Sequence, residues 1–316
     1  MFELIFLGTS ASAPSIRRNL SAAMVLHREY RFLIDCGEGT QRQLLKSGLG
    51  FKRLEKILLT HGHLDHILGL GGLLSTFSRW ETIPKLEIYG GSWALERVSD
   101  LIFKVVFRGA KPPLQIDLIP IEPGIVMEDD TFELSAFPVT HRGPGCLGFM
   151  FREKEKRPFL VDKAEALGVP AGPERSRLVR GETVTLADGT VVHPDQVLGP
   201  PIPGAKLVFV GDAARVNDLV EVAWNADALV IEATYLSQEE ELAREYGHLT
   251  AAEAATLAQR AQVKQLYLTH ISRRYSEEAV LAEARAIFPQ TIVAKDFDRI
   301  RIVKEKTLPA RSDESA

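Results

Sequence analysis

The chain has 316 residues, of which 45% are hydrophobic, so it is long enough for one large domain or two small ones with a sizeable core. A net charge of −4 excludes a globally basic nucleic-acid binder, and any such contact must come from local patches. No stretch approaches the roughly 20 apolar residues of a membrane span. Cys36 and Cys146 are the only cysteines, which favours free thiols in a reducing compartment. The short apolar run after Met1 lacks the basic start of a signal peptide, so we expect a cytoplasmic protein without a membrane partner.

The first predicted elements lead to a cluster of histidines. Residues 2–7 are predicted to form a strand, and residues 22–26 and 31–35 a hairpin. The hairpin ends at Asp35, which either lines a site or caps the glycine-rich turn that follows. Residues 56–59 are short, aliphatic and bounded by polar residues, as is typical of a buried parallel strand.

Three histidines and one aspartate follow that strand within six residues: His61, His63, Asp65 and His66. They emerge at the carboxyl end of a parallel strand, the edge at which open α/β sheets bind ligands. Imidazole and carboxylate groups are common ligands of zinc. The first two histidines alternate along an extended chain and can share one ion, whereas the aspartate and the last histidine begin the next turn and can reach a second. Since the whole chain has only eight histidines, we prefer a metal site to a solvated loop.

The middle of the chain supplies a further ligand and an interruption. Helices are predicted at 67–74 and 93–107, and strands at 85–89, 115–119 and 132–138; the last strand leads to His141, a candidate third ligand of the first ion. From about 152 to 200 a charge run, two turn-rich segments and a hairpin signal break the rhythm. We expect an insertion that projects from the core, either as a solvated loop or as a substrate-docking arm.

The last third of the chain repeats the pattern of strands that end in polar residues. The strand predicted at 206–210 leads to Asp212, whose two oxygens can bridge two ions. Residues 265–270 echo residues 56–61 and end in His270, which suggests two similar βα layers with metals between them. His248 precedes a helix that Thr250 and Glu253 open as a capping box. Residues 305–316 are predicted to be a flexible tail.

The candidate ligands of the two ions are His61, His63, Asp65, His66, His141, Asp212 and His270. If Asp212 is shared by both ions, each ion has three or four protein ligands and room for a water molecule. Two zinc ions lower the pKa of a bridging water and stabilise the attacking and leaving oxygens, which suits hydrolysis of a phosphodiester. His248 can then protonate the leaving oxygen, with Glu232 orienting it, and Arg274 can hold a phosphate. A structural zinc site is often closed by cysteines, and a di-iron redox site typically has an acidic residue where this chain has His63, so we favour neither.

The motif at 61–66 resembles the signature of the metallo-β-lactamase superfamily of two-zinc hydrolases. Segments 6–10, 35–41, 197–201 and 268–275 extend the likeness over nearly the whole chain, which resembles the ribonuclease Z family of transfer-RNA 3′-processing endonucleases. The resemblance implies an αββα sandwich with a protruding exosite arm, two zinc ions per chain, precursor transfer RNA as the substrate and a homodimer. It also implies Asp65 as the general base, His248 as the proton donor, Gly172 and Pro173 in the arm that grips the RNA body, and Arg18 in a loop that handles its 3′ region.

The chain departs from the family pattern at a few positions. The usual motif has glycine between the second histidine and the aspartate, whereas here Leu64 holds that position and Gly62 lies between the first two histidines. Ile231 stands where histidine is usual, and Ile16 stands where lysine is usual. None of these departures removes a metal ligand. We therefore predict a single domain of residues 1–316 that cleaves the 3′ trailer of precursor transfer RNA by metal-activated water. The alternatives are a two-zinc hydrolase of a small phosphodiester, sulfate ester or other ester, and a non-catalytic RNA-binding relative.

Overall fold

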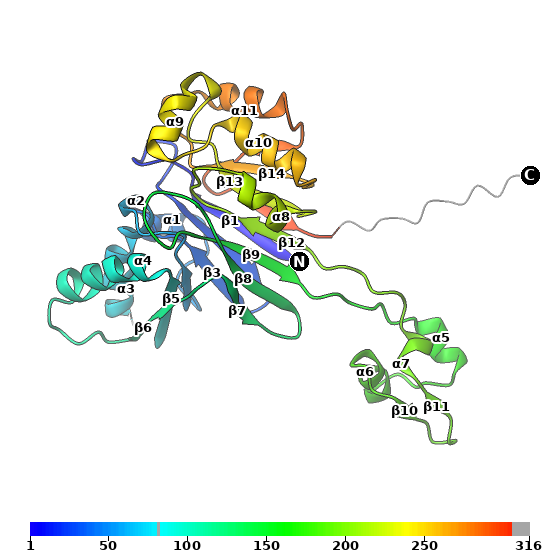
Figure 1. Ribbon diagram of the computed structural model, residues 1–316. Helices are drawn as coiled ribbons and strands as arrows, with labels where there is room; N and C mark the ends of the chain where they lie inside the picture. Colours follow the sequence, from blue (N-terminus) through cyan, green and yellow to red (C-terminus); the bar gives the residue numbers. More distant parts are fainter. Residues whose placement is uncertain (81–82, 305–316) are drawn as a thin grey trace, which may run out of the picture. The chain divides into compact units, whose positions relative to one another are not determined.

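The computed structural model describes residues 1–80 and 83–304 (Figure 1). The tail predicted at 305–316 lies outside the described residues. The chain divides into two compact units, one made of residues 1–152 and the chain from residue 205 onward, the other of residues 153–204. No helix among the described residues is long and apolar enough to span a bilayer.

The larger unit contains two seven-stranded sheets. The first has the order β16 (Arg299–Ile302), β1 (Phe2–Gly8), β2 (Ala22–His27), β3 (Tyr30–Ile34), β4 (Lys56–Leu58), β5 (Lys85–Gly90) and β6 (Gln115–Pro120). The second has the order β15 (Thr291–Val293), β14 (Leu266–Thr269), β13 (Ala228–Glu232), β12 (Lys206–Phe209), β9 (Leu147–Glu153), β8 (Phe132–Pro138) and β7 (Gly124–Glu128). Strands β3 to β6 are parallel, as are β12 to β15. Each sheet thus has one edge at which several strands end together.

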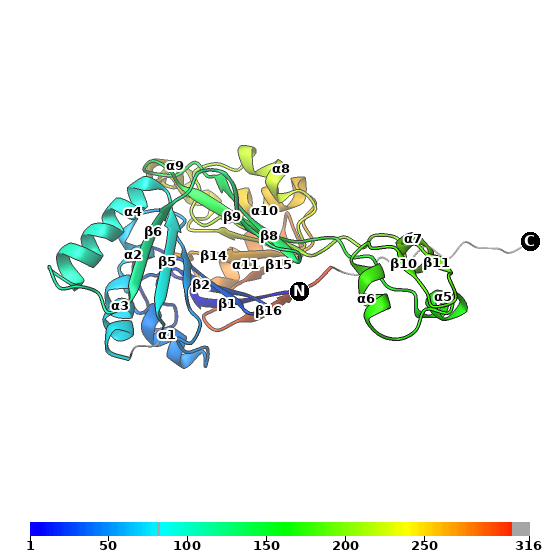
Figure 2. The same ribbon diagram turned by 90° about the horizontal axis from the view of Figure 1, so that it is seen from below.

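Helices cover the outer face of each sheet (Figures 1 and 2). Those of the first sheet are α1 (Thr40–Lys46), α2 (Leu64–Ile67), α3 (Gly69–Trp80) and α4 (Ser92–Ser99). Those of the second are α8 (Val220–Ala223), α9 (Glu240–Tyr246), α10 (Ala251–Arg260) and α11 (Glu277–Arg285). A buried apolar cluster joins each sheet to its helices, and a third, rich in phenylalanine, fills the space between the sheets. The αββα sandwich predicted from the sequence is confirmed.

Two local predictions need correction. The helix predicted over 93–107 stays α-helical only to Ser99 and continues as a π-helix over Asp100–Val106. The mostly apolar run 101–106 favours a buried element but does not reveal its hydrogen-bond pattern. Strand β7 was not predicted. Three of its five residues are exposed, the first is a glycine, and the segment lacks a clear alternation of apolar and polar residues.

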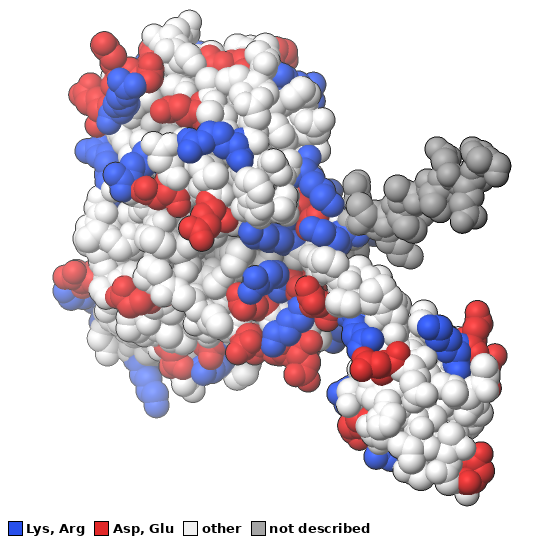
Figure 3. Space-filling view, turned by 45° about the vertical axis from the view of Figure 1, so that its right-hand side comes forward, with Lys and Arg blue, Asp and Glu red and all other residues white. Residues whose placement is uncertain are grey.

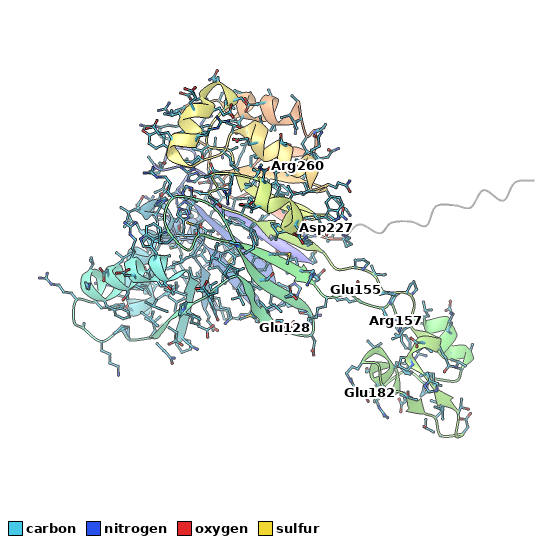
Figure 4. All side chains as sticks on the ribbon, in the orientation of Figure 1. Glu128, Glu155, Arg157, Glu182, Asp227 and Arg260 are labelled. Carbon is cyan, nitrogen blue, oxygen red and sulfur yellow. The ribbon has the colours of Figure 1, made fainter. Side chains whose placement is uncertain are left out.

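The smaller unit contains α5 (Val161–Ala166), α6 (Pro173–Val179), β10 (Val184–Thr185), β11 (Val191–Val192) and α7 (Pro194–Val197). Its core consists of six buried residues: Ala164, Val169, Leu178, Val184, Val192 and Val197. Arg157, labelled in Figure 4, fastens the two ends of this unit, because its guanidinium donates to the carbonyl oxygen of Gly199 at 2.8 Å and to Asp195 Oδ1 at 2.5 Å. Residues 153–204 are therefore an ordered unit with their own apolar core.

Candidate metal centre

The strand ends of the two sheets bring seven polar side chains together. His61, His63, Asp65 and His66 follow β4, His141 follows β8, Asp212 follows β12 and His270 follows β14. Asp212 lies at the middle of the group. Its Oδ2 is 3.4 Å from Nε2 of both His66 and His270, and 3.8 Å from Nε2 of both His61 and His141.

The imidazoles on one side of Asp212 form a compact donor set. Nε2 of His61 lies 2.9 Å from Nδ1 of His63, and Nε2 of His141 lies 3.3 Å from the same atom. Burial, with the neighbouring His66 next in importance, lowers the pKa of His61 well below its usual value. Burial and the neighbouring His141 lower the pKa of His63 to about 4. These rings are therefore neutral at pH 7 and keep a free lone pair, as metal ligation requires.

The second donor set lies on the other side of Asp212. Oδ2 of Asp65 is 3.4 Å from Nε2 of His270 and 3.8 Å from Nε2 of His66. Nε2 of His66 and Oδ1 of Asp212 are buried and have no hydrogen-bond partner among the described residues. Buried polar atoms are nearly always satisfied, so these two point to a missing partner. Converging imidazole nitrogens and carboxylate oxygens fit divalent cations in both donor sets.

A buried carboxylate orients the ligands that follow β4. Nδ1–H of His66 donates to Asp35 Oδ2 at 2.8 Å. The Thr60 hydroxyl donates to the same oxygen at 2.7 Å and lies 3.0 Å from Nδ1 of His61, from which it accepts. Both histidines thus carry their proton on Nδ1 and turn Nε2 toward the ion. Asp35 therefore lines the site and supports ligands from both donor sets.

Glu232 repeats this arrangement in the second sheet. Its fully buried carboxylate accepts from Nδ1–H of His248 at 2.9 Å and from the Thr234 hydroxyl, which lies 2.9 Å from Nδ1 of His270. Burial alone lowers the pKa of His248, but the charge and hydrogen bond of Glu232 outweigh it and raise that pKa to about 9. Sequence reasoning missed Thr60 and Thr234, because a threonine at a strand end carries no signal of its hydroxyl partners.

The sequence and the fold are similar to those of known proteins. The model described as "Beta-lactamase superfamily domain" matches residues 192–271, and the model described as "Anti-Pycsar protein Apyc1" matches residues 2–154. Ribonuclease Z of Bradyrhizobium sp. (strain ORS 278) is 48% identical over 302 residues, which cover 96% of this chain and 100% of that protein. Ribonuclease Z of Brevibacillus brevis is 42% identical over 313 residues, which cover 96% and 97%.

The chain belongs to the ribonuclease Z family. The crystal structure of human tRNase Z, short form, has a TM-score of 0.66 and 28% identity, and covers 95% of this chain and 99% of that chain. The metallo-β-lactamase fold protein YhfI from Bacillus subtilis shares the fold, with a TM-score of 0.68 and 18% identity. The resemblance predicted from the sequence is confirmed. Membership implies metal ions, and the converging histidines and aspartates fit them.

Trp93 accounts for one departure from the ribonuclease Z pattern. Its ring centroid lies 5.7 Å from that of His63, at an interplanar angle of 88°. A Cβ on Gly62 would lie 3.1 Å from Cε3 of Trp93, and a Cβ on Gly143 would lie 2.8 Å from its Cζ3. The indole therefore fills the space beside the ligand loops that a larger residue at 62 would need. Leu64, by contrast, is 49% exposed.

The predicted substrate-binding residues lie in different surroundings. Arg18 Nη2 is 3.2 Å from Glu277 Oε2, and its Nη1 donates to the Thr9 hydroxyl at 2.7 Å. Arg274 Nη1 is 2.9 Å from Glu239 Oε1. Both arginines are thus committed to intramolecular ion pairs. Gly172 and Pro173 begin helix α6 in the 153–204 unit, where both are exposed.

Proposed function

We propose that this chain removes the 3′ trailer of precursor transfer RNA with two zinc ions held by the seven converging residues. Membership of the ribonuclease Z family makes it an endoribonuclease, a hydrolase of phosphodiester bonds. The observation that carries the two-ion proposal is the position of Asp212. Its Oδ2 lies 3.4–3.8 Å from imidazole nitrogens of both donor sets, as a carboxylate shared by two ions would.

The protein side chains have separate tasks in this chemistry. The ions, when bound, supply positive charge for the phosphate oxygens and lower the pKa of a coordinated water. Asp65 is the proposed general base, and the backbone N–H of Ser12 fixes its Oδ2 at 3.1 Å. His248 is the proposed proton donor to the leaving oxygen. Glu232 holds Nδ1 of that ring, so Nε2 is the nitrogen left for the substrate.

The 153–204 unit is the proposed docking arm for the body of the RNA. Its own core supports it as a preformed element, and the exposed residues Gly172 and Pro173 stand at the start of α6. Arg18 and Arg274 remain candidates for substrate contact only if RNA displaces Glu277 and Glu239. We also propose a cytoplasmic location, where precursor transfer RNA is the substrate.

A homodimer is a further part of the proposal. Large apolar side chains are exposed along the segment from α2 to α3 and on the π-helix that follows α4: Leu64, Leu68, Trp80, Phe103 and Val105. Exposed apolar surface often marks protein–protein contacts, and we propose these side chains as part of the interface. Analytical ultracentrifugation of Trp80→Glu against the unaltered chain tests this, because a charge there weakens self-association if this surface is the interface.

The function is tested with two substrates and three variants. The zinc-loaded protein is incubated with a 3′-extended precursor transfer RNA and with bis-p-nitrophenyl phosphate. We expect both to be cleaved, and Asp65→Ala and His248→Gln to lower turnover of the RNA at least about 100-fold. Asp130→Ala, at an exposed position, is the control and should behave as the unaltered chain. Cleavage of the small ester alone would keep the centre and contradict transfer RNA as the substrate.

A further inference from the structure

A pocket of about 180 Å³ lies at the amino ends of strands β13 and β14, whereas the metal ligands follow the carboxyl ends of the strands. The end of β16 from the first sheet closes it, and Asp227, Lys264 and Arg301 are among its lining residues. The ligand His270 comes six positions after Lys264, which is roughly 20 Å along an extended strand. A group bound in this pocket therefore does not touch the metal centre.

Four cationic side chains gather around this pocket and one buried carboxylate. Asp227, labelled in Figure 4, has its Oδ1 3.1 Å from Nζ of Lys264 and 3.4 Å from Nζ of Lys304. Its Oδ2 accepts from the backbone N–H of Lys206 at 2.9 Å, which brings the start of β12 to the same place. Arg301 is the fourth cation. Within residues 1–80 and 83–304, Asp227 is the one carboxylate that forms an ion pair with any of the four.

Arg301 is the cation whose charge the fold does not use. Its side chain is exposed, and in the described part of the chain no ion pair or hydrogen bond engages its guanidinium. Glu3 is its register partner in the pairing of β1 with β16, but Oε1 of Glu3 is 3.2 Å from Nη1 of Arg299. Arg301 can therefore bind an anion without first breaking an internal ion pair.

Lys206 shows that positive charges crowd this region. Its ammonium donates to the carbonyl oxygen of Trp224 at 2.8 Å. Burial, followed by the charges of Arg152 and Lys304, lowers the pKa of Lys206, and the charge of Asp227 offsets only part of this. Like charges that disfavour one another in this way are stabilised by an added anion. The pocket thus lacks negative charge, although the protein as a whole carries −4.

The size of the pocket limits what the anion can be. Pockets that enclose whole small-molecule ligands measure about 300–1,000 Å³, so 180 Å³ suits a single charged group better than a complete nucleotide. Four cations against one carboxylate leave an excess of more than one charge, which favours a phosphate group over a carboxylate. A phosphate oxygen pair also matches the planar fork of an arginine.

We propose that this pocket binds a phosphate group, with Arg301 and Lys264 as its main donors. The Lys264 side chain is 40% exposed, so its ammonium can reach a ligand while it stays beside Asp227. The phosphate belongs either to the backbone of an RNA or to a free phosphorylated small molecule, and the two share the chemistry that the pocket recognises. The proposal goes beyond the proposed function and does not depend on it, because phosphate binding is measured without RNA cleavage.

The first test locates phosphate binding by NMR. Inorganic phosphate is titrated into the zinc-loaded full chain, and the amide resonances of residues 227–229 and 301–303 are followed. We expect these to shift with one saturable Kd on the order of 1 mM. The metal centre also attracts phosphate, but the amides of residues 61–66 report that event separately.

Arg301→Gln is the principal variant, because this arginine has no internal ion pair whose loss would disturb folding. It should raise Kd at the pocket amides at least about 5-fold, and Arg301→Lys should restore part of the affinity. The matched control is Arg79→Gln, an exposed arginine of α3, which should bind phosphate as the unaltered chain does. Shifts of residues 61–66 should be the same in all four proteins.

Two results would overturn the proposal. One is the absence of saturable shifts at residues 227–229 and 301–303 up to about 20 mM phosphate, well above the expected Kd. The other is an equal Kd for Arg301→Gln and Arg79→Gln. Neither result bears on RNA cleavage, and failure to cut precursor transfer RNA would contradict the proposed function alone, so the two failures are distinguishable.

The second test identifies the source of the phosphate. If an RNA backbone supplies it, Arg301→Gln should raise KM for precursor transfer RNA several-fold and reduce the slope of log(kcat/KM) against log salt by about 0.7 to 1. Turnover of bis-p-nitrophenyl phosphate should stay unchanged, because the pocket is remote from the metal centre. RNA kinetics equal to those of Arg79→Gln, together with weakened phosphate binding, would assign the pocket to a free phosphorylated molecule.

Discussion

At the scale of single residues, the small size of Gly62 is matched by the large indole of Trp93. In the histidine motif a glycine stands between two ligands, and the indole of Trp93 occupies the space above it, 5.7 Å from the ring of His63. Arg97 lies over the same indole at 5.4 Å and helps to fix it. The exchange of Gly62 and Leu64 therefore alters the packing beside the ligand loop and removes none of the candidate ligands.

We predict that Gly62→Leu and Trp93→Ala are coupled. Leucine at 62 collides with the indole and should destabilise the protein by about 1–3 kcal/mol, as overpacking does. Trp93→Ala removes the indole, while Cα of Ala94, 3.0 Å from a Cβ at position 62, still limits the space. The double variant should therefore be about 1 kcal/mol more stable than the sum of the singles predicts, but not as stable as the unaltered chain. Urea unfolding of the four proteins measures this, with zinc content as a second readout. Additive free energies would show that the two side chains do not compete for space.

The Thr60 hydroxyl gives a second prediction at the same scale. It connects Asp35 to Nδ1 of the ligand His61, and Thr60→Val removes the connection with little change of shape. Lost support of this kind typically weakens metal binding about 10- to 100-fold, which a competition titration with a chelator measures. Thr60→Ser keeps the hydroxyl and should bind zinc as the unaltered chain does. Equal zinc affinities of the valine and serine variants would show that the Thr60 hydroxyl does not contribute to metal binding.

These two cases show why the sequence predicted some site residues and missed others. His61, His63 and His66 are recognisable because their residue types and spacing suit a metal. Thr60 and Trp93 act through contacts with other strands or helices, and those contacts exist only after folding. Arg18 and Arg274 show the converse limit. Their charge suggests phosphate binding, but the sequence does not reveal Glu277 and Glu239, which neutralise them in the fold.

At the scale of elements, strand β5 carries a charge cluster that ties it to β4. Glu87 accepts from the ammonium of Lys85 at 2.7 Å, from the hydroxyl of Tyr89 at 2.9 Å and from the ammonium of Lys56. Burial alone raises the pKa of this carboxyl, but the hydrogen bonds from the two lysines outweigh it and lower that pKa to about 2. A depressed pKa means that the folded state favours the ionised form.

We predict a pH-dependent cost for Glu87→Gln. The contribution of Glu87 is present above the unfolded pKa of about 4.5 and is lost as pH falls toward about 2. The variant should therefore be less stable at pH 7 by about 1 kcal/mol, as for a partly exposed ion pair, and the difference should shrink below pH 4.5. Urea unfolding between pH 3 and 7 measures it, with the exposed Glu122→Gln as the control. A difference that stays constant with pH would exclude the charge as its cause.

The elements themselves were predictable to different degrees. The buried strands β4, β12 and β14 stand out as short aliphatic runs, and the polar residues that follow them marked the edge of the site. Strand β7 and the π-helix after α4 were not predicted, because most of β7 is exposed and the residue types at 100–106 do not distinguish a π-helix from an α-helix. The echo between residues 56–61 and 265–270 suggested two similar βα layers with metals between them, whereas the αββα sandwich was implied by the resemblance to the ribonuclease Z family.

At the scale of the whole molecule, the net charge of −4 is small for a chain of 316 residues. Side chains of both signs are interspersed on the face drawn in Figure 3, in keeping with the net charge of −4. A polyanion such as RNA must therefore be bound by local groups of cations. Some cationic side chains are already paired within the protein. The carboxylate of Asp227, labelled in Figure 4, lies 3.1 Å from the ammonium of Lys264 and 3.4 Å from that of Lys304.

The last prediction concerns the 153–204 unit. Arg152 and Lys206 are paired residues of the antiparallel strands β9 and β12, so the ends of the larger unit at this point are adjacent. An Asn-Gly link between Arg152 and Ala205 closes a short hairpin loop and keeps Ala205 in the core, and the core clusters of the larger unit contain no residue of 153–204. The shortened protein should therefore fold and hydrolyse bis-p-nitrophenyl phosphate as the full chain does.

On precursor transfer RNA the same deletion should raise KM at least about 10-fold, because contacts with the RNA body are lost while the metal centre remains. Steady-state kinetics give KM for the RNA and the turnover of bis-p-nitrophenyl phosphate, and the zinc content shows whether the metal centre is intact. Pro173→Ala in the full chain is a milder companion that keeps the unit and alters only the turn at the start of α6. Unchanged KM for the RNA in the deletion would mean that the substrate is held by the larger unit alone.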